Sequence, residues 1–306
     1  MKENKKKTPQ EILKEDGNII KTRDDYDLIF VDSKGKVQNT EDCSWLSDES
    51  DSLLNNKAFR SRIEPWLTSL FQSEHLSLLC GSGITNAISF LAGVGSGTTM
   101  AGATFTNYKN AIESAAQESA KASGRENGNI EDQIRTANDL LKGLKILGET
   151  NKAQTLEQEL NSIVSEFATS ILTSEKGIAV AEGEKRENAY RVLVNFLLSF
   201  ASRTGNKERL NIFTTNYDRL IEIGAELAGI HLMDRFVGIM MPIFRSSRLN
   251  LDIHYNPPGI RGEPRYLEGV ARLTKLHGSV DWVQNGGEIR RIGLPFGADN
   301  IDPYLQ

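Results

Sequence analysis

A long stretch without proline, from Thr104 to Arg203, lies between short apolar segments of the chain and limits the folds open to it. Apolar residues recur along it every three or four positions, which is the spacing of one face of an amphipathic helix. The clearest series is Leu156, Leu160, Ile163, Val164, Phe167 and Ile171. Residues 124–129 and 148–151 contain glycine and asparagine and divide the stretch into separate helices. We predict a large helical insertion at about residues 104–205, with its apolar faces packed as a core.

The segments on either side of this insertion have the pattern of buried strands, because each is short, apolar and followed by a polar or glycine-rich turn. They are residues 75–80, 210–213 and 273–276. Helical spacing returns between the last two, through Leu220, Ile223 and Leu227. Strands that alternate with helices are typical of parallel sheets. The predicted fold class is therefore α/β, a Rossmann-like parallel sheet with helices on both faces and the large helical insertion.

Residues 1–60 are more polar and richer in charge than the rest of the chain, so we treat them as an N-terminal appendage. Within them, residues 27–37 predict a possible β-hairpin. Residues 61–306 are expected to form one main domain that contains the insertion, since 306 residues allow one large or two modest domains. Two further segments are predicted: a helix at 63–71 with Pro65 in its first turn, and a loop-rich, β-containing stretch at 235–276.

Composition and charge exclude several classes of protein. The 36 basic and 41 acidic side chains give a net charge of -5, which offers no general attraction to nucleic acid or to anionic membranes. No apolar run reaches the ~20 residues of a membrane-spanning helix, and the N-terminus lacks the apolar part of a signal peptide. Cys43 and Cys80 are too few for a disulfide framework or a four-cysteine zinc site. We expect a cytoplasmic protein without zinc, membrane or direct nucleic-acid partners.

The first predicted strand stops at two glycines, Gly81 and Gly83, which flank Ser82. Glycines at the carboxyl end of a strand let backbone N–H groups approach a phosphate closely, and ligands of open α/β sheets bind at this end. An ordinary tight turn has the same pattern, so both interpretations stay open. A second glycine group at 93–99 has no lysine at the spacing of a P-loop, which excludes a Walker motif.

The other two turns carry polar and titratable side chains. Residues 214–218, Thr-Thr-Asn-Tyr-Asp, place two hydroxyls, an amide and a carboxylate after a strand. Alternatively, a threonine caps the next helix and Asp218 favours its positive end. His277 precedes Gly-Ser, which leaves its imidazole accessible, although a lone histidine is more often structural. For each turn, the residues alone leave both interpretations open.

The three turns, in their order along the chain, resemble the motifs of the sirtuin family. The matching segments are Cys-Gly-Ser-Gly-Ile-Thr at 80–85, Thr-Thr-Asn-Tyr-Asp at 214–218 and Lys-Leu-His-Gly-Ser-Val-Asp-Trp at 275–282. In these segments the chain looks most similar to the bacterial sirtuin-like NAD-hydrolysing proteins of anti-phage defence. The resemblance implies a sirtuin-like NAD-binding domain over 61–306, with NAD as the substrate.

The resemblance also implies roles for individual residues. The NAD phosphates and the nicotinamide-side ribose are implied to contact Gly81, Ser82, Gly83 and Thr85. Asn216 would hold the ribose and the attacking water, and His277 would be the general base near the ribose hydroxyls. Thr215 and Asp218 would shape the nicotinamide pocket. This assignment is chemically coherent, because breaking the bond to nicotinamide develops positive charge on the sugar and needs one oriented water.

The sequence departs from the sirtuin pattern at three places. Ser82 stands where the family usually has alanine, and the loop at 97–100 lacks the proline often found there. The later motif that holds the adenine ribose is not found between Trp282 and Gln306. We therefore expect that the chain lacks or borrows part of the nucleotide site, and that it binds NAD weakly on its own.

Three functions are compatible with these residues. NAD hydrolysis, which would deplete NAD in anti-phage defence, needs neither a protein substrate nor zinc. A non-catalytic scaffold that senses NAD or another nucleotide is the main alternative. NAD-dependent deacylation is the third, but in sirtuins it generally accompanies a zinc module of paired Cys-x-x-Cys, which two isolated cysteines cannot build. The resemblance implies assembly into a homo-oligomer and a possible HerA-type P-loop ATPase partner, and the broad apolar faces at 104–205 would allow a subunit contact.

Overall fold

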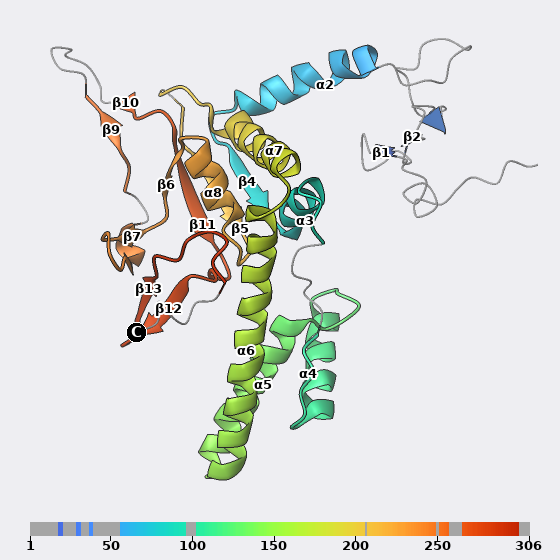
Figure 1. Cartoon of the computed structure of the whole chain (residues 1–306), viewed down its shortest axis with the longest axis vertical. Helices are drawn as coiled ribbons and strands as arrows, with labels where there is room; N and C mark the ends of the chain where they lie inside the picture. Colours follow the sequence, from blue (N-terminus) through green and yellow to red (C-terminus); the bar gives the residue numbers. More distant parts are fainter. Residues whose placement is uncertain are drawn as a thin grey trace, which may run out of the picture. The chain divides into compact units, whose positions relative to one another are not determined.

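The computed structural model of the chain divides into two compact units, Met1–Ser73 and Glu74–Gln306, which are described separately. Figure 1 shows the course of the chain and its helices and strands. The structure describes residues 18–20, 29–31, 37–38, 56–95, 102–205, 207–248, 251–256 and 265–299.

The described residues of the first unit form a small antiparallel sheet and helix α2. Strands β1 (Asn18–Ile20), β2 (Ile29–Val31) and β3 (Val37–Gln38) pair in the order β1-β2-β3. Antiparallel β2 and β3 lie where the sequence predicts a hairpin, and the turn between them lies outside the described residues. Helix α2 (Asn56–Phe71) begins earlier than expected, so Pro65 lies inside it and not in its first turn. Residues with good helix propensity before Pro65 account for the earlier start.

The second unit is built on a parallel sheet of four strands, β4-β5-β11-β6 (Figure 1). These strands are β4 (Ser77–Cys80), β5 (Leu210–Thr214), β11 (Val270–Lys275) and β6 (His231–Met233). All three neighbouring pairs are parallel, and helices precede and follow the strands along the chain. The α/β class predicted from the sequence is therefore the class of this fold.

The register of the sheet brings the ends of three strands to one level. Cys80 pairs with Thr214, and Thr214 pairs with Lys275. The residues that follow are the three turns singled out in the sequence. Because the carboxyl ends of parallel strands lie at the same edge of a sheet, these turns must lie close together.

The two faces of this sheet differ in burial. Leu78 and Ile212, on one face, are buried, whereas Leu79 on the other face is 72% exposed. On that second face the sheet borders a hollow of about 410 Å³, lined in part by Phe213 and Thr274. Among the described residues of the second unit, no helical layer covers this face, which differs from the expectation of helices on both faces. The cause lies in residues after β6, which form short strands and loops in place of a helix.

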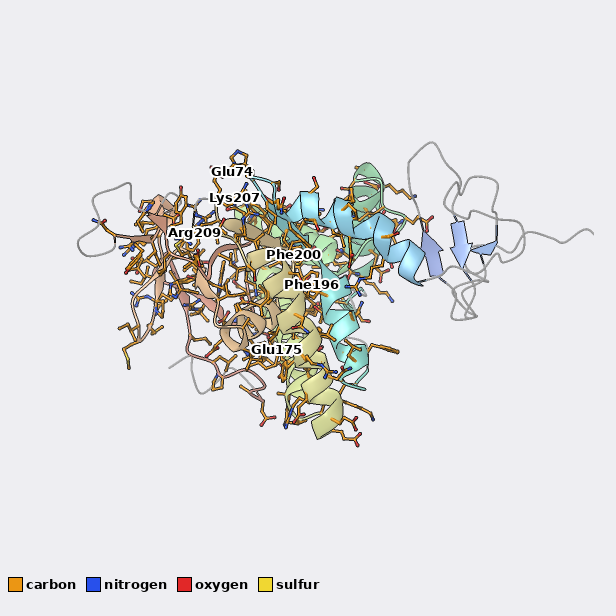
Figure 2. All side chains as sticks on the ribbon, turned by 90° about the horizontal axis from the view of Figure 1, so that it is seen from above. Glu74, Glu175, Phe196, Phe200, Lys207 and Arg209 are labelled. Atoms are coloured by element: carbon orange, nitrogen blue, oxygen red, sulfur yellow. The ribbon has the colours of Figure 1, made fainter. Side chains whose placement is uncertain are left out.

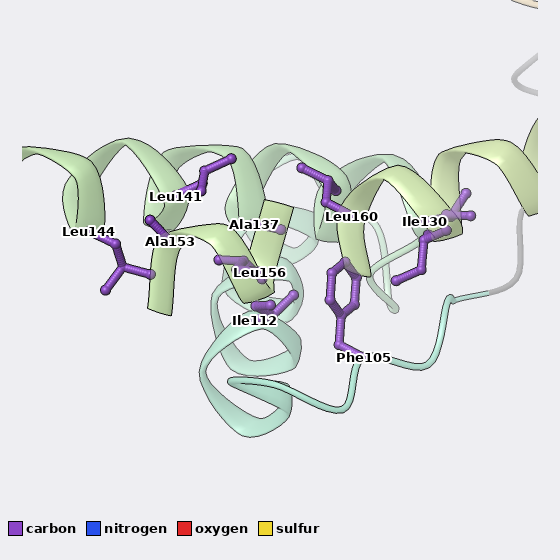
Figure 3. Close-up of a cluster of buried hydrophobic side chains, with 10 residues drawn as sticks. Phe105, Ile112, Ile130, Ala137, Leu141, Leu144, Ala153, Leu156 and Leu160 are labelled. Carbon is purple, nitrogen blue, oxygen red and sulfur yellow. The ribbon is translucent and has the colours of Figure 1, made fainter. Parts of the chain in front are cut away.

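The predicted insertion forms four helices between β4 and β5. They are α4 (Lys109–Ala122), α5 (Ile130–Ile146), α6 (Thr150–Ala179) and α7 (Gly183–Ala201). Helices α4, α5 and the first half of α6 enclose a core of their own (Figure 3). Its buried side chains are Phe105, Ile112, Ile130, Ala137, Leu141, Leu144, Ala153, Leu156, Leu160 and Ile163. We call this part, residues 102–163, the arm.

The rest of the insertion belongs to the sheet-bearing part of the unit. Helix α7 contacts α3 (Ser82–Leu91) and α8 (Leu220–Leu227), the helices that follow β4 and β5. Gly224 of α8 allows this close approach, because a Cβ atom there would lie 2.7 Å from Cγ of Leu193. Helix α6 runs for 30 residues, about 45 Å at 1.5 Å per residue, and so extends from the arm into this layer (Figure 1).

A second, antiparallel sheet follows the order β12-β13-β8-β7. Its strands are β12 (Trp282–Asn285), β13 (Glu288–Arg291), β8 (Ile243–Phe244) and β7 (Phe236–Val237). Rings of Phe236, Phe244 and Trp282 pack together, with centroids 5.0 to 5.9 Å apart.

The segment predicted as loop-rich and β-containing also holds η2 (Ser246–Arg248) and the antiparallel pair β9 (His254–Tyr255) and β10 (Arg265–Tyr266). Buried Arg209, labelled in Figure 2, ties this segment to the start of β5 through Asp252 and the carbonyl oxygens of Ile253 and Leu267. Among the described residues, no helix has both the length and the apolar character needed to cross a bilayer.

Candidate functional site

A cavity of about 200 Å³ lies where the three turns meet. Six of the eight residues singled out in the sequence line it: Ser82, Thr85, Thr215, Asn216, Asp218 and His277. Seven lining residues were not singled out: Asn86, Asn129, Glu131, Phe167, Ile171, Ser174 and Tyr217. Gly81 and Gly83 are not among the lining residues, although the Gly81 carbonyl oxygen accepts a hydrogen bond from Asn216.

The glycine-containing segment is the start of a helix and not a separate tight turn. Gly81 precedes α3 in extended conformation, and α3 begins at Ser82. A Cβ atom at Gly81 or Gly83 would meet no described atom within 4 Å, so packing does not require glycine there. No side chain caps the helix start. The consequence is an uncovered N-terminus whose N–H groups and positive dipole end favour an anion.

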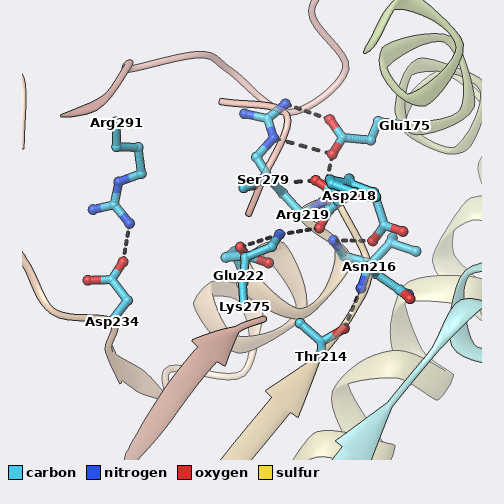
Figure 4. A network of polar contacts seen from close by, with 12 residues as sticks. Glu175, Thr214, Asn216, Asp218, Arg219, Glu222, Asp234, Lys275, Ser279 and Arg291 are labelled. Carbon is cyan, nitrogen blue, oxygen red and sulfur yellow. Dashed lines mark hydrogen bonds and ion pairs between the residues drawn. The ribbon is translucent and has the colours of Figure 1, made fainter. Parts of the chain in front are cut away.

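Asn216, which is labelled with Thr214 and Asp218 in Figure 4, lines the cavity and is held by a short network of hydrogen bonds. Its Nδ2 atom donates to the Gly81 carbonyl and to Oγ1 of Thr85, both at 3.0 Å, and Thr85 in turn donates to Oδ2 of Asp218 at 2.6 Å. Because a carbonyl oxygen can only accept, the amide orientation follows from these contacts. With both N–H groups used, Oδ1 is the atom of Asn216 left for a further contact.

Neither threonine of the 214–218 turn caps α8, whose N-cap residue is Arg219 without a side-chain capping bond, and the side chains of this turn serve its local geometry and the cavity. Oγ1 of Thr214 accepts from the Asn216 backbone N–H at 3.0 Å, and Oδ1 of Asp218 accepts from the Leu220 backbone N–H at 3.1 Å. These contacts shape the turn and the start of α8. The other carboxylate oxygen of Asp218 faces Thr85. One side chain thus serves both the local turn and the cavity.

The turn that carries His277 is fixed against the 214–218 turn. The Leu276 backbone N–H donates to the Thr214 carbonyl at 2.8 Å, and the Val280 N–H donates to the Tyr217 carbonyl at 3.0 Å. Gly278 has φ +95°, in the left-handed region that favours glycine. The imidazole therefore sits beside the Tyr217 ring, with centroids 6.1 Å apart.

Glu131 from α5 also enters the site, beside His277. Its Oε1 lies 2.9 Å from Nδ1 of His277 and accepts a hydrogen bond from the Tyr217 hydroxyl at 2.6 Å. Burial, and then the bond to Glu131, hold the pKa of the Tyr217 hydroxyl well above its usual range. In the sequence, Glu131 is one more acidic residue in the first turn of a helix, where a carboxylate favours the dipole in any case. Nothing in that pattern distinguishes it as a site residue.

Two ion pairs, one buried at both partners and one between buried Lys275 and partly exposed Glu222, lie beside the site (Figure 4). Arg219, next to Asp218, binds both carboxylate oxygens of Glu175 on α6, and Lys275 of β11 lies 2.9 Å from Oε1 of Glu222 on α8. Burial raises the pKa of the Glu175 and Glu222 carboxyls, while Arg219 and Lys275 oppose this. Removing one partner would leave a buried charge unpaired, so these pairs fix the elements around the cavity.

Helix α6 supplies the apolar wall of the cavity through Phe167 and Ile171. The Phe167 ring meets the Tyr217 ring edge-on, with centroids 5.5 Å apart. A wider, largely apolar groove of about 690 Å³ lies alongside and shares Glu131 and His277 with the cavity. The site is thus built jointly by the sheet, by α6 and by the start of α5.

Two further features considered in the sequence are a metal site and the second glycine group. No group of three or more His, Cys, Asp or Glu side chains with the spacing of a metal site occurs in the described ranges. Of the second glycine group, only residues 93–95 are described, and 96–99 lie outside the described residues.

In comparisons with known proteins, neither a protein-family model nor a curated protein sequence matches the chain.

Proposed function

We propose that the chain is a sirtuin-like NAD glycohydrolase with a Rossmann-like domain, which releases nicotinamide and ADP-ribose from NAD. The observation that carries this proposal is the convergence of the Thr85–Asn216–Asp218 network and His277 on one cavity at the carboxyl ends of parallel strands. The resemblance assigns these residues to the phosphates and ribose (Thr85), to the ribose and water (Asn216), to the nicotinamide pocket (Asp218) and to the general base (His277). By the same resemblance, we propose that the reaction depletes NAD in anti-phage defence.

The proposed reaction breaks the bond between the anomeric carbon of the ribose and the nicotinamide nitrogen. Nicotinamide leaves with the bonding electron pair, the sugar gains oxocarbenium character, and the oxygen of one water adds to the anomeric carbon. Oδ1 of Asn216 suits the orientation of this water or of a ribose hydroxyl, because the network fixes the amide. His277 accepts the proton released on addition and passes it to solvent.

The start of α3 suits the phosphates of the same substrate. Backbone N–H groups at a helix N-terminus, together with its dipole, favour anionic oxygens, and the bare Gly81 and Gly83 leave them accessible. A cavity of about 200 Å³ is smaller than the ~300–1,000 Å³ of pockets that enclose a drug-sized ligand. It therefore suits the nicotinamide ribose end of NAD, and weak binding of the whole dinucleotide stays a prediction.

The decisive experiment follows nicotinamide release from NAD by the purified chain and by two variants. We expect Asn216→Ala and His277→Ala each to lower the rate on the order of 10²-fold or more, since each removes a group that orients or deprotonates a reactant. Asn195→Ala and His231→Ala, exposed positions away from the cavity, are the matched controls and should keep the parent rate.

Circular dichroism must show that the site variants are folded. A folded variant with the parent rate contradicts the site assignment. If the parent chain binds NAD but releases no nicotinamide, the proposed hydrolase activity is wrong and the alternative, a nucleotide-sensing scaffold, is favoured.

A further inference from the structure

We propose that Glu131 is a positioning residue for His277, so that the start of α5, in the arm, forms part of the candidate active site. The contact itself is independent of the reaction, whereas its catalytic consequence rests on the proposed function. Glu131 and His277 are separated by 146 positions in the sequence, and Glu131 and Tyr217 by 86. One carboxylate oxygen joins residues from two separate turns of the site.

The contact determines which nitrogen of His277 carries hydrogen. An ionised glutamate accepts hydrogen bonds and cannot donate them, and Tyr217 already donates to the same Oε1 atom. The 2.9 Å separation of that atom from Nδ1 of His277 therefore requires an Nδ1–H donor. In the neutral imidazole this leaves the lone pair on Nε2, the atom that can accept a proton.

Glu131 is held in place by the structure that begins α5. Asn129 and Asp132 form a capping box, in which each side chain accepts from the backbone N–H of the other at 3.1 Å. Arg125 binds both oxygens of Asp132 at 2.8 Å, and this bond holds the pKa of the Asp132 carboxyl below its usual range. Residue 131 lies between these two capping residues. Its backbone position is therefore defined independently of His277.

A chance surface ion pair is a poorer explanation of the contact. Surface pairs contribute about 0–1 kcal/mol and as a rule join two flexible, solvated side chains. Here the glutamate and histidine side chains are 31% and 41% exposed, and both line the cavity with Tyr217. A hydroxyl donor and an imidazole donor converge on one oxygen, which restricts the carboxylate in two directions.

The first test measures the tautomer of His277 directly and needs no NAD. In protein labelled with ¹⁵N-histidine, nitrogen chemical shifts distinguish the Nδ1–H and Nε2–H tautomers, and the spectrum of His277→Ala assigns the resonances. We expect His277 to be the Nδ1–H tautomer in the parent chain and in Glu131→Gln, whose amide oxygen still accepts. Glu131→Ala should shift it toward Nε2–H. An unchanged His277 pattern in folded Glu131→Ala overturns the proposal.

The second test measures nicotinamide release by the same variants. We expect Glu131→Ala to lower kcat on the order of 10²-fold with little change in KM. The kcat of Glu131→Gln should lie between those of Glu131→Ala and the parent chain. Glu113→Ala, an exposed carboxylate on α4 of the arm, is the matched control and should leave kcat unchanged.

The two readouts separate the possible failures. A changed tautomer with an unchanged kcat overturns the catalytic role of Glu131. If the parent chain does not cleave NAD but Glu131→Ala changes the tautomer, the proposed hydrolase fails while the Glu131–His277 contact stands.

Discussion

At the scale of single residues, the candidate site contains some residues that the sequence pattern identifies and others that are identified only by their contacts in the folded chain. Asn216 and His277 stand out because each follows a predicted strand, and the resemblance assigns them roles. Glu131 and Tyr217 do not stand out, because a glutamate near a helix start and a tyrosine in a turn have ordinary local explanations. Their function as neighbours of His277 depends on contacts between distant segments, which no local pattern encodes.

Tyr217 supplies a prediction about stability at alkaline pH. Its pKa is raised in the folded state, so above about pH 10 the unfolded chain loses this proton before the folded chain does. The hydroxyl of Tyr217 therefore makes its full contribution to the free energy of unfolding below about pH 10, and this contribution declines as the pH rises further. We expect Tyr217→Phe to cost about 1 kcal/mol at pH 8, through the lost bond to Glu131, and less at higher pH.

Urea unfolding of both proteins between pH 8 and about pH 11 measures this difference. A difference that stays constant over the range, or that grows with pH, contradicts a raised pKa of Tyr217 in the folded state.

At the scale of elements, the helices of the insertion follow from apolar periodicity, and the strands from short apolar runs that end in turns. The sequence-based prediction differs from the structure in which faces of the parallel sheet are covered by helices. Leu79 continues an apolar run, yet it lies on a sheet face that no helix covers among the described residues. Periodicity cannot tell which face of a strand will be covered, because both faces of a parallel strand have the same apolar pattern.

The start of α5 allows a stability prediction with an internal control. The Asp132 side chain is 4% exposed, caps the helix and binds Arg125, so Asp132→Asn should destabilise the fold by about 2 kcal/mol at pH 7. Because the folded pKa of this carboxyl is lowered, its contribution is present above about pH 4 and is lost as the pH falls through the folded value. The wild-type advantage should thus shrink with acidification.

Asp139 on the same helix is the control, since its side chain is 68% exposed and forms a surface ion pair with Lys142 at 3.2 Å. Asp139→Asn should change stability by less than about 0.5 kcal/mol. If urea unfolding shows equal effects of the two substitutions, the capping box and the ion pair between Arg125 and Asp132 do not contribute to the free energy of unfolding.

At the scale of the whole molecule, exposed apolar side chains bear on the proposed assembly. Ile239, Met240 and Met241 are three consecutive apolar residues with exposures of 93%, 87% and 38%. Consecutive exposed apolar residues are unfavourable in water unless a partner covers them. We therefore predict that the chain self-associates at micromolar concentration, and that Ile239→Ser combined with Met240→Ser weakens the association.

Light scattering with size-exclusion chromatography measures the mass of both proteins. A single species near the chain mass of 33.9 kDa for the unaltered protein rules out self-association. A HerA-type ATPase remains a proposed second partner, and co-purification with such a protein is a separate measurement.

The continuous course of α6 has a mechanical consequence for the chemistry. The arm rests on the first half of this helix and carries Glu131, whereas His277 lies on the turn after β11. Because α6 continues from the arm into the layer beside the sheet, a tilt of the arm would lengthen the 2.9 Å contact between Glu131 and His277. We therefore expect that displacement of the arm relative to the sheet changes the tautomer of His277, and with it the proton transfer of the proposed reaction.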